Sequence, residues 1–297
     1  SSRSPAAPAP GLSPRRRPAS RGPRSRRRRS TVARLVRRPS LVVSLIVLAG
    51  WALAPLAVAV VGLDAYGQAG PVNQAPGWAH LLGTDNLGRD VWARTLAGAG
   101  PILAVAPAAT ALGTVVGAVL GLLAGYHRRL VDDLLMRSFD VLHAVPGIIA
   151  ILLVTSAFGR SPAVIAIAIG LFSAPQIART VRSAVFVETA KPYVEAARGQ
   201  GESTPRLLFA ELLPNIAPVL VVEATIRLGF AVFASAGLSF LGLGPQPPSP
   251  DWGLVVSQNR IFIQTAWWSV AAPALAIMTL VVAVNLIADN LREVLAT

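Results

Sequence analysis

The chain has 297 residues, of which 53% are apolar and only 14% are charged. Soluble domains carry about 25% charged residues, so this composition favours one polytopic membrane protein over two soluble domains. The sequence contains no cysteine, which excludes disulfide scaffolds, zinc ribbons and cysteine-ligated iron–sulfur sites.

The net charge of +13 comes from the N-terminal segment. Residues 1–40 hold 13 arginines and no acidic residue, so the remaining chain has 14 basic and 14 acidic residues. Because the segment consists mainly of Arg, Ser, Pro, Ala and Gly, we predict a disordered cytoplasmic tail over 1–40, not a cleavable signal peptide. Contact with anionic membrane lipid is its favoured role, and RNA binding is the alternative. The neutral body has no basic face, so it is expected to have no nucleic-acid partner.

Six apolar runs predict membrane-spanning helices, each of which needs about 20 mostly apolar residues. The runs cover residues 41–62, 101–126, 141–159, 161–177, 216–241 and 265–288. Such long Gly- and Ala-rich runs do not alternate as barrel strands do, so the predicted fold is all-α with six transmembrane helices. The third and fourth runs are expected to form a helical hairpin. The second has a glycine at every fourth position, which favours close helix packing on one face: Gly113, Gly117, Gly121 and Gly125.

Basic residues predict the orientation of these helices, because loops rich in Arg and Lys remain in the cytoplasm. The loops opposite the tail hold only four basic residues: Arg89, Arg94, Arg160 and Arg260. We therefore expect a multi-pass protein of the cytoplasmic (inner) cell membrane with both termini inside. The expected divisions are a first transmembrane helix at 41–62, an outer loop with a short helix at 63–100, a transmembrane core at 101–289 and a cytoplasmic C-terminus at 290–297.

One charged pair lies within a predicted span. Glu223 and Arg227 are four residues apart, so they share a helix face and can form a salt bridge. A charge in the bilayer is costly, so the pair should face the protein interior. Two interpretations stay open: the pair lines a translocation path or partner interface, or it is a self-neutralised pair buried in the bundle.

Motifs for catalysis, metal binding and nucleotide binding are missing from the sequence. There is no HExxH, no GxSxG and no GxxxxGK[ST] loop, and Lys191 is the only lysine. We therefore expect no catalytic residue, no bound metal and no ATP site on this chain.

The longest inner loop has a helix–turn–helix pattern. Glu195, Ala196 and Ala197 end a predicted first helix that breaks at Gly199 and Gly201. Thr204 is the predicted cap of a second helix over 205–213, and Pro214 then marks entry into the fifth span. Such an elbow suits docking into a groove of another protein.

This spacing resembles the EAA loop of ABC importer permeases: Glu-Ala-Ala at 195–197, then Gly201, then Leu213 and Pro214. The chain departs from that pattern at Glu211, where an apolar residue is preferred, and at Gly199, where alanine is more usual. The resemblance implies that Glu195 orients the elbow through a contact with an ATPase or an internal cap. It implies that Ala196 and Ala197 allow close docking, and that Gly201 permits the turn of a coupling loop spanning 188–214.

Two more stretches resemble the dipeptide/oligopeptide/nickel group, in its second (C-type) permease subunit. The stretch at 83–90 resembles the GTDxxGRD signature through Gly83, Thr84, Asp85, Gly88, Arg89 and Asp90. The segment at 237–244, with the PDWG sequence at 250–253, resembles the part that follows the fifth span. Ser235 and Ala236 stand where relatives often have an acidic residue. A purely structural alternative is that the first stretch is a capped turn leading to a helix at Val91–Ala97, and that PDWG is a structural turn.

The resemblance implies the type I ABC importer permease fold and a role as half of a heterodimeric pore. The implied partners are a homologous permease, two ATPase subunits that bind ATP and Mg, and an extracytoplasmic substrate-binding protein. Short peptides are the expected cargo, with nickel chelates or haem as alternatives. A non-ABC secondary carrier or a membrane scaffold is the alternative class.

Overall fold

The computed structural model describes residues 38–295, and most of the predicted tail lies outside them. Within the described part, helices account for all regular structure apart from one isolated bridge between Thr84 and Asp90. The long helices are α2 (Pro39–Val61), α4 (Ala99–Tyr126), α7 (Pro162–Thr189), α10 (Leu213–Phe240) and α12 (Trp268–Leu295). The shorter ones are α3 (Val91–Ala97), α5 (Leu130–His143), α6 (Gly147–Phe158), α8 (Pro192–Gly199), α9 (Thr204–Arg206), a π-helix (Leu207–Leu212), α11 (Trp252–Asn259) and a 3-10 helix (Arg260–Phe262).

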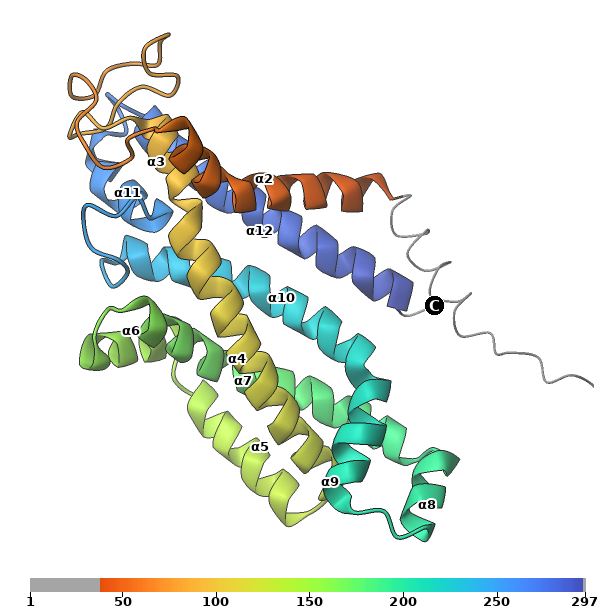
Figure 1. Ribbon diagram of the computed structural model, residues 1–297. Helices are drawn as coiled ribbons and strands as arrows, with labels where there is room; N and C mark the ends of the chain where they lie inside the picture. Colours follow the sequence, from red (N-terminus) through yellow and green to blue (C-terminus); the bar gives the residue numbers. More distant parts are fainter. Residues whose placement is uncertain (1–37, 296–297) are drawn as a thin grey trace, which may run out of the picture.

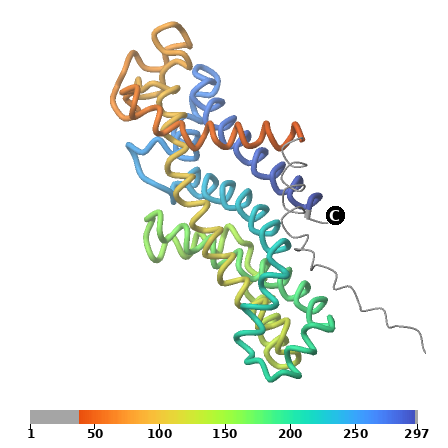
Figure 2. Tube along the Cα trace, turned by 45° about the vertical axis from the view of Figure 1, so that its right-hand side comes forward, coloured from red at the N-terminus to blue at the C-terminus, as the bar shows by residue number. Residues whose placement is uncertain are grey.

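The long helices form an elongated bundle with different structures at its two ends (Figure 1). One end, the loop end, carries residues 63–90 and α11. The other, the elbow end, carries α8 and α9, at the lower right of Figure 1. The tube in Figure 2 shows the same separation after a 45° turn. Helix α2 begins at Pro39 because proline at the first helical position already has a helical φ, so the predicted tail boundary at 40 is slightly late.

The third predicted span is wrong as a straight helix. Residues 130–143 and 147–158 form two helices, α5 and α6, that meet at a bend of 83°. Pro146 lies in the break; it lacks an amide hydrogen and pushes the preceding residue out of the helical region. The described chain therefore has five helices long and apolar enough to cross a membrane, or six if the bent pair counts as one span.

The fourth span is longer than predicted, because its arginines form ion pairs with acidic residues of another helix. Helix α7 continues past residue 177 to Thr189. Arg179 donates to Asp140 over 2.7 Å, and Arg182 donates to both carboxylate oxygens of Asp132. Both acceptors lie on α5, so these ion pairs connect α5 to the elbow half of α7.

The glycine face of α4 packs directly on α7, as the four-residue spacing predicted. Gly113 lies against the backbone of Gly170, and a Cβ on Gly121 would lie 2.6 Å from the carbonyl oxygen of Ala178. Only glycine permits this separation, which lets the two helices run in contact along most of their length.

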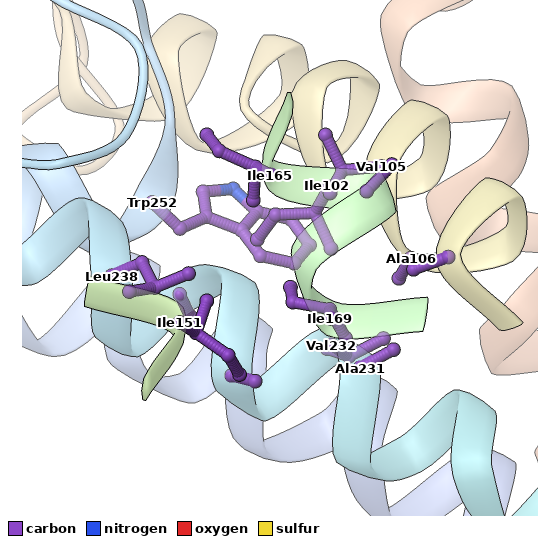
Figure 3. Close-up of a cluster of buried hydrophobic side chains, with 14 of the residues drawn as sticks. Ile102, Val105, Ala106, Ile151, Ile165, Ile169, Ala231, Val232, Leu238 and Trp252 are labelled. Atoms are coloured by element: carbon purple, nitrogen blue, oxygen red, sulfur yellow. The ribbon is translucent and has the colours of Figure 1, made fainter. Parts of the chain in front are cut away.

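A central apolar core joins the loop half of the bundle (Figure 3). Trp252 of α11 lies close to Ile102 of α4 and Ile165 of α7, and Ile151 of α6 and Leu238 of α10 belong to the same cluster. This core holds α6 against α7 and α10, so one half of the bent pair is fixed in the bundle.

Candidate functional site

The elbow is held in place by a second apolar cluster, at the other end of the bundle. Val194 of α8 is fully buried together with Leu207 and Leu212 of the π-helix, against Leu122 of α4 and Val185 of α7. The elbow is therefore seated on the ends of two transmembrane helices.

The motif residues of α8 lie on its outer surface. Glu195 and Ala196 are exposed and Ala197 is half-buried. Gly201 has φ of +76°, and no atom lies within 4 Å of where a Cβ would be. Glycine is therefore needed here for its backbone conformation, since the site has space for a side chain. The elbow presents a small-residue surface with one carboxylate near the start of a helix.

A polar brace, which the sequence interpretation did not assign, fixes the angle of the elbow. The carboxylate of Glu188, at the end of α7, accepts hydrogen bonds from Lys191 Nζ at 2.7 Å and Tyr193 Oη at 2.9 Å. Asn215 of α10 donates to Tyr193 Oη at 3.2 Å. Burial and the bond to Glu188 raise the pKa of Tyr193 to about 12, so the tyrosine keeps its proton at neutral pH. The only sequence signal was the clustering of polar residues around Pro192.

Leu213 and Pro214 do not separate the elbow from the fifth span, contrary to the prediction. The chain from Thr204 to Phe240 is one continuous helix of 37 residues. Pro214 has no amide hydrogen for the preceding turn, and that turn widens to a π-helix in which Leu213 N donates to Leu208 O. Leu213 is half-buried against the elbow cluster and Pro214 is exposed. The helix begins after Ser203, so Thr204 is its first residue and not its cap.

The loop motif at 83–90 is folded into the interior of the loop end. Asp85 is fully buried; its carboxylate accepts from the amides of Leu87 and Arg89 at 2.8 and 3.0 Å, and from Arg89 Nε at 2.8 Å. Gly83 and Gly88 have φ of +69° and +70°, and a Cβ on either would clash with neighbouring backbone. Asp90 caps α3 by accepting from Ala93 N at 2.9 Å. This geometry matches the capped-turn interpretation.

Hydrogen bonds join the motif to α11: Asn86 N donates to Asn259 Oδ1 at 3.2 Å, and Arg89 Nη2 donates to Gln258 Oε1 at 3.3 Å. Two more residues join the following helix α3 to the segment around α11. Arg94, whose position in the sequence indicated only an outer basic residue, donates to the carbonyls of Ala65 and Ser249 at 2.9 and 3.0 Å. The indole of Trp252 donates to Thr95 O at 2.7 Å. Asp251 caps α11 through Leu254 N, and burial raises the pKa of its carboxyl. The PDWG segment and the loop motif therefore form one buried unit.

The intramembrane pair forms and is part of a longer chain of polar contacts. Arg227 Nε donates to Glu223 Oε1 over 2.7 Å, and Arg227 Nη1 donates to Gln176 Oε1 of α7. The amide nitrogen of Gln176 lies 3.2 Å from Nε2 of His143, whose Nδ1 lies 3.0 Å from Phe139 O. The pair itself was predictable from the sequence, but its partners Gln176 and His143 were not, because they lie on other helices.

Comparison with known proteins identifies the family. Residues 117–296, well over half of the chain, match the family described as binding-protein-dependent transport system inner membrane component. The chain belongs to this family. The elbow, the bent pair and the intramembrane pair all lie within the matched residues.

Named relatives align over most of their length. The chain is 36% identical over 256 residues to the dipeptide transport system permease protein DppC of Alkalihalophilus pseudofirmus, covering 86% of this chain and 84% of that protein. It is 39% identical over 215 residues to the di/tripeptide transport system permease protein DppC of Pseudomonas aeruginosa, covering 72% and 71%. It is 39% identical over 224 residues to the glutathione transport system permease protein GsiD of Pectobacterium atrosepticum, covering 75% and 74%.

Family membership decides between the classes left open by the sequence. The chain is a multi-pass membrane permease component of an ABC importer, and the secondary-carrier and scaffold alternatives are not favoured. Binding-protein dependence means that an ATPase and a substrate-binding protein act with it.

Proposed function

We propose that this chain is the C-type permease subunit of an importer that moves short peptides into the cytoplasm. The named relatives support the cargo, because they are described as dipeptide, di/tripeptide and glutathione permeases. The observation that carries the mechanism is the exposed α8 surface, seated on the buried cluster that joins α4, α7 and the π-helix. Nickel chelates or haem are the second choice of cargo, and no feature of the described chain favours them.

In this proposal the elbow end faces the cytoplasm, and α8 docks on an ATPase subunit. Two such subunits bind ATP and Mg, and a homologous permease completes the pore. This chain contributes no ATP site. When ATP closes the ATPase dimer, the displacement enters at Glu195, Ala196 and Ala197. The packing of α8 passes it to α7, and the continuous helix from Thr204 to Phe240 carries it to the middle of the bundle.

Reconstitution tests the proposal. The chain would be co-purified with the candidate partner permease, ATPases and binding protein, and ATP-driven uptake of radiolabelled L-alanyl-L-alanine into proteoliposomes would be measured. We expect uptake that needs ATP and the binding protein and that persists without an ion gradient. Uptake that follows an ion gradient and needs no ATPase, or an absence of dipeptide uptake by the assembled complex, would contradict it.

A further inference from the structure

The polar chain that runs from Glu223 to His143 lies at the mid-depth of the bundle. Helix α10 (Leu213–Phe240) has its midpoint between residues 226 and 227, and α7 (Pro162–Thr189) has its midpoint between residues 175 and 176. Arg227 and Gln176 therefore meet near the middle of these two helices, away from the ends of either one. Glu223 and Arg227 are the only charged residues of α10, so the pair is costly to place there.

The break between α5 and α6 lies at the same depth. His143 is the last residue of α5, and its contact with Gln176 places the break beside the midpoint of α7. Regular helical hydrogen bonding stops between His143 and Gly147. The residues in this break are not fully covered by the rest of the chain, since 41% of Val145 is exposed. Irregular backbone at mid-membrane depth is tolerated where protein covers it or where it borders a water-filled path, so this side of the chain does not face lipid.

The arginine is held but still reachable. Glu223 is buried, whereas 22% of the Arg227 side chain remains accessible. Arg227 has two acceptors, one charged and one neutral, and the neutral one can be exchanged for a carboxylate without leaving a buried charge unpaired. A carboxylate in place of the neutral Gln176 oxygen would give the guanidinium a second ionic partner, and carboxylates can accept two parallel hydrogen bonds from arginine.

We propose that Arg227 and Glu223 form a transient site for the charged termini of a peptide in transit. Arg227 receives the cargo carboxylate in place of Gln176, and Glu223 receives the cargo ammonium. The broken span and the pair together line one wall of the path. Gln176 is a positioning residue that holds Arg227 between passages. This inference rests on the proposed peptide import.

The test uses the double variant Glu223→Gln/Arg227→Gln, which removes both charges at once. Removing both charges together avoids the unpaired buried charge that removal of one partner would leave, and glutamine keeps hydrogen-bonding groups at both positions. The matched control is Asp140→Asn/Arg179→Gln, which neutralises another ion pair between helices, nearer the elbow end and largely exposed.

We expect the double variant to assemble with its partners and to hydrolyse ATP at the wild-type basal rate in the absence of peptide. Uptake of radiolabelled L-alanyl-L-alanine should fall at least about tenfold, the value of one lost charge-assisted bond. The control should keep wild-type uptake. If the double variant does not assemble, Arg227→Lys replaces it: this variant keeps the cation, and half-maximal uptake should then need several-fold more peptide-loaded binding protein.

Three outcomes would overturn the proposal in distinguishable ways. Wild-type uptake by the double variant, or by Arg227→Lys where that variant replaces it, would make the pair a self-neutralising structural element. A parallel loss of basal ATP hydrolysis and uptake would make it a structural latch between helices. Absence of ATP-driven dipeptide uptake by the wild-type complex would remove the proposed function and this site with it.

Discussion

At the scale of single residues, Gly201 is needed for its backbone conformation, whereas the acidic residues of the loop motif are needed for the hydrogen bonds that they accept. Gly201 needs its left-handed φ of +76° but has free space around it. The carboxylate of Asp85 accepts hydrogen bonds from backbone amides and from Arg89, and that of Asp90 accepts one from a backbone amide. The spacing of Gly201 and the motif acids was visible in the sequence. The burial of Asp85 was not visible, because it depends on segments such as residues 249–259 that are distant in the chain.

Replacing Gly201 by valine is expected to uncouple transport without preventing membrane insertion. The left-handed conformation costs most residues roughly 1–2 kcal/mol, and it costs a β-branched residue more. Valine at this position would therefore displace the elbow. Peptide uptake per ATP hydrolysed by the reconstituted complex should fall severalfold. Gly199→Ala is the control, since Gly199 has a free Cβ position and no positive φ. Equal coupling in both variants would count against the elbow assignment.

Asp251 allows a pH prediction at the loop end. Burial raises its folded-state pKa above the unfolded value of 3.8, so the ionised carboxyl weakens the fold at neutral pH. The penalty shrinks as pH falls through the folded pKa, because the folded state then takes up a proton more readily than the unfolded state. Asp251→Asn keeps the cap and removes the charge, so its Tm should equal or exceed that of the wild type at pH 7.

Intrinsic fluorescence of the protein in detergent over a series of pH values from neutral to acidic would measure this difference. The Tm advantage of Asp251→Asn should decrease as pH falls through the folded-state pKa of the carboxyl. Asp251→Ala, which loses the cap as well, should be less stable by about 0.5–2 kcal/mol. An advantage that grows with acidity would show that the assigned sign is wrong.

At the scale of elements, composition predicted the long helices well and the breaks poorly. Hydropathy located α2 and α4 nearly to their ends, because neither contains a charged residue. For α12 it predicted an end at 288, but the helix continues through the charged residues that follow to Leu295, so the predicted C-terminal segment from 290 is largely helical. It failed for α5, whose acidic residues Asp132 and Asp140 form ion pairs with α7. It also failed at Pro214, where the preceding turn widens to a π-helix, so the helix continues through the proline. A local sequence pattern shows neither ion pairs with a distant helix nor a change in the width of a helical turn.

The contact between α4 and α7 gives an element-scale prediction with a matched pair of substitutions. In Gly121→Ala the new Cβ would lie 2.6 Å from Ala178 O and from Val181 Cβ, so the helices must separate. Overpacking of this kind costs about 1–3 kcal/mol. Gly50→Ala makes the same chemical change in α2, where nothing lies within 4 Å. The first should lower the Tm and the second leave it unchanged or slightly higher, and equal effects would argue against the close packing.

At the scale of the whole molecule, the elbow end and the mid-depth pair are joined by rigid structure. The helix from Thr204 to Phe240 carries both the π-helix under α8 and the Glu223–Arg227 pair. The brace of Glu188, Tyr193 and Asn215 fixes the angle at which α8 meets this helix and α7. We therefore expect the part of a displacement of α8 that reaches the bundle to depend on how rigidly the brace holds this angle.

Tyr193→Phe tests that dependence, because it removes one hydroxyl and keeps the ring. The variant loses the bond to Glu188 and the one from Asn215, a net cost of about 0.5–1.5 kcal/mol for each. The fold should persist, since Val194 and the rest of the elbow cluster are untouched. We expect basal ATP hydrolysis near the wild-type rate and a lower ratio of peptide imported to ATP hydrolysed. Tyr126→Phe is the matched control at the other tyrosine of the elbow cluster. A wild-type ratio in Tyr193→Phe would mean that apolar packing alone transmits the displacement.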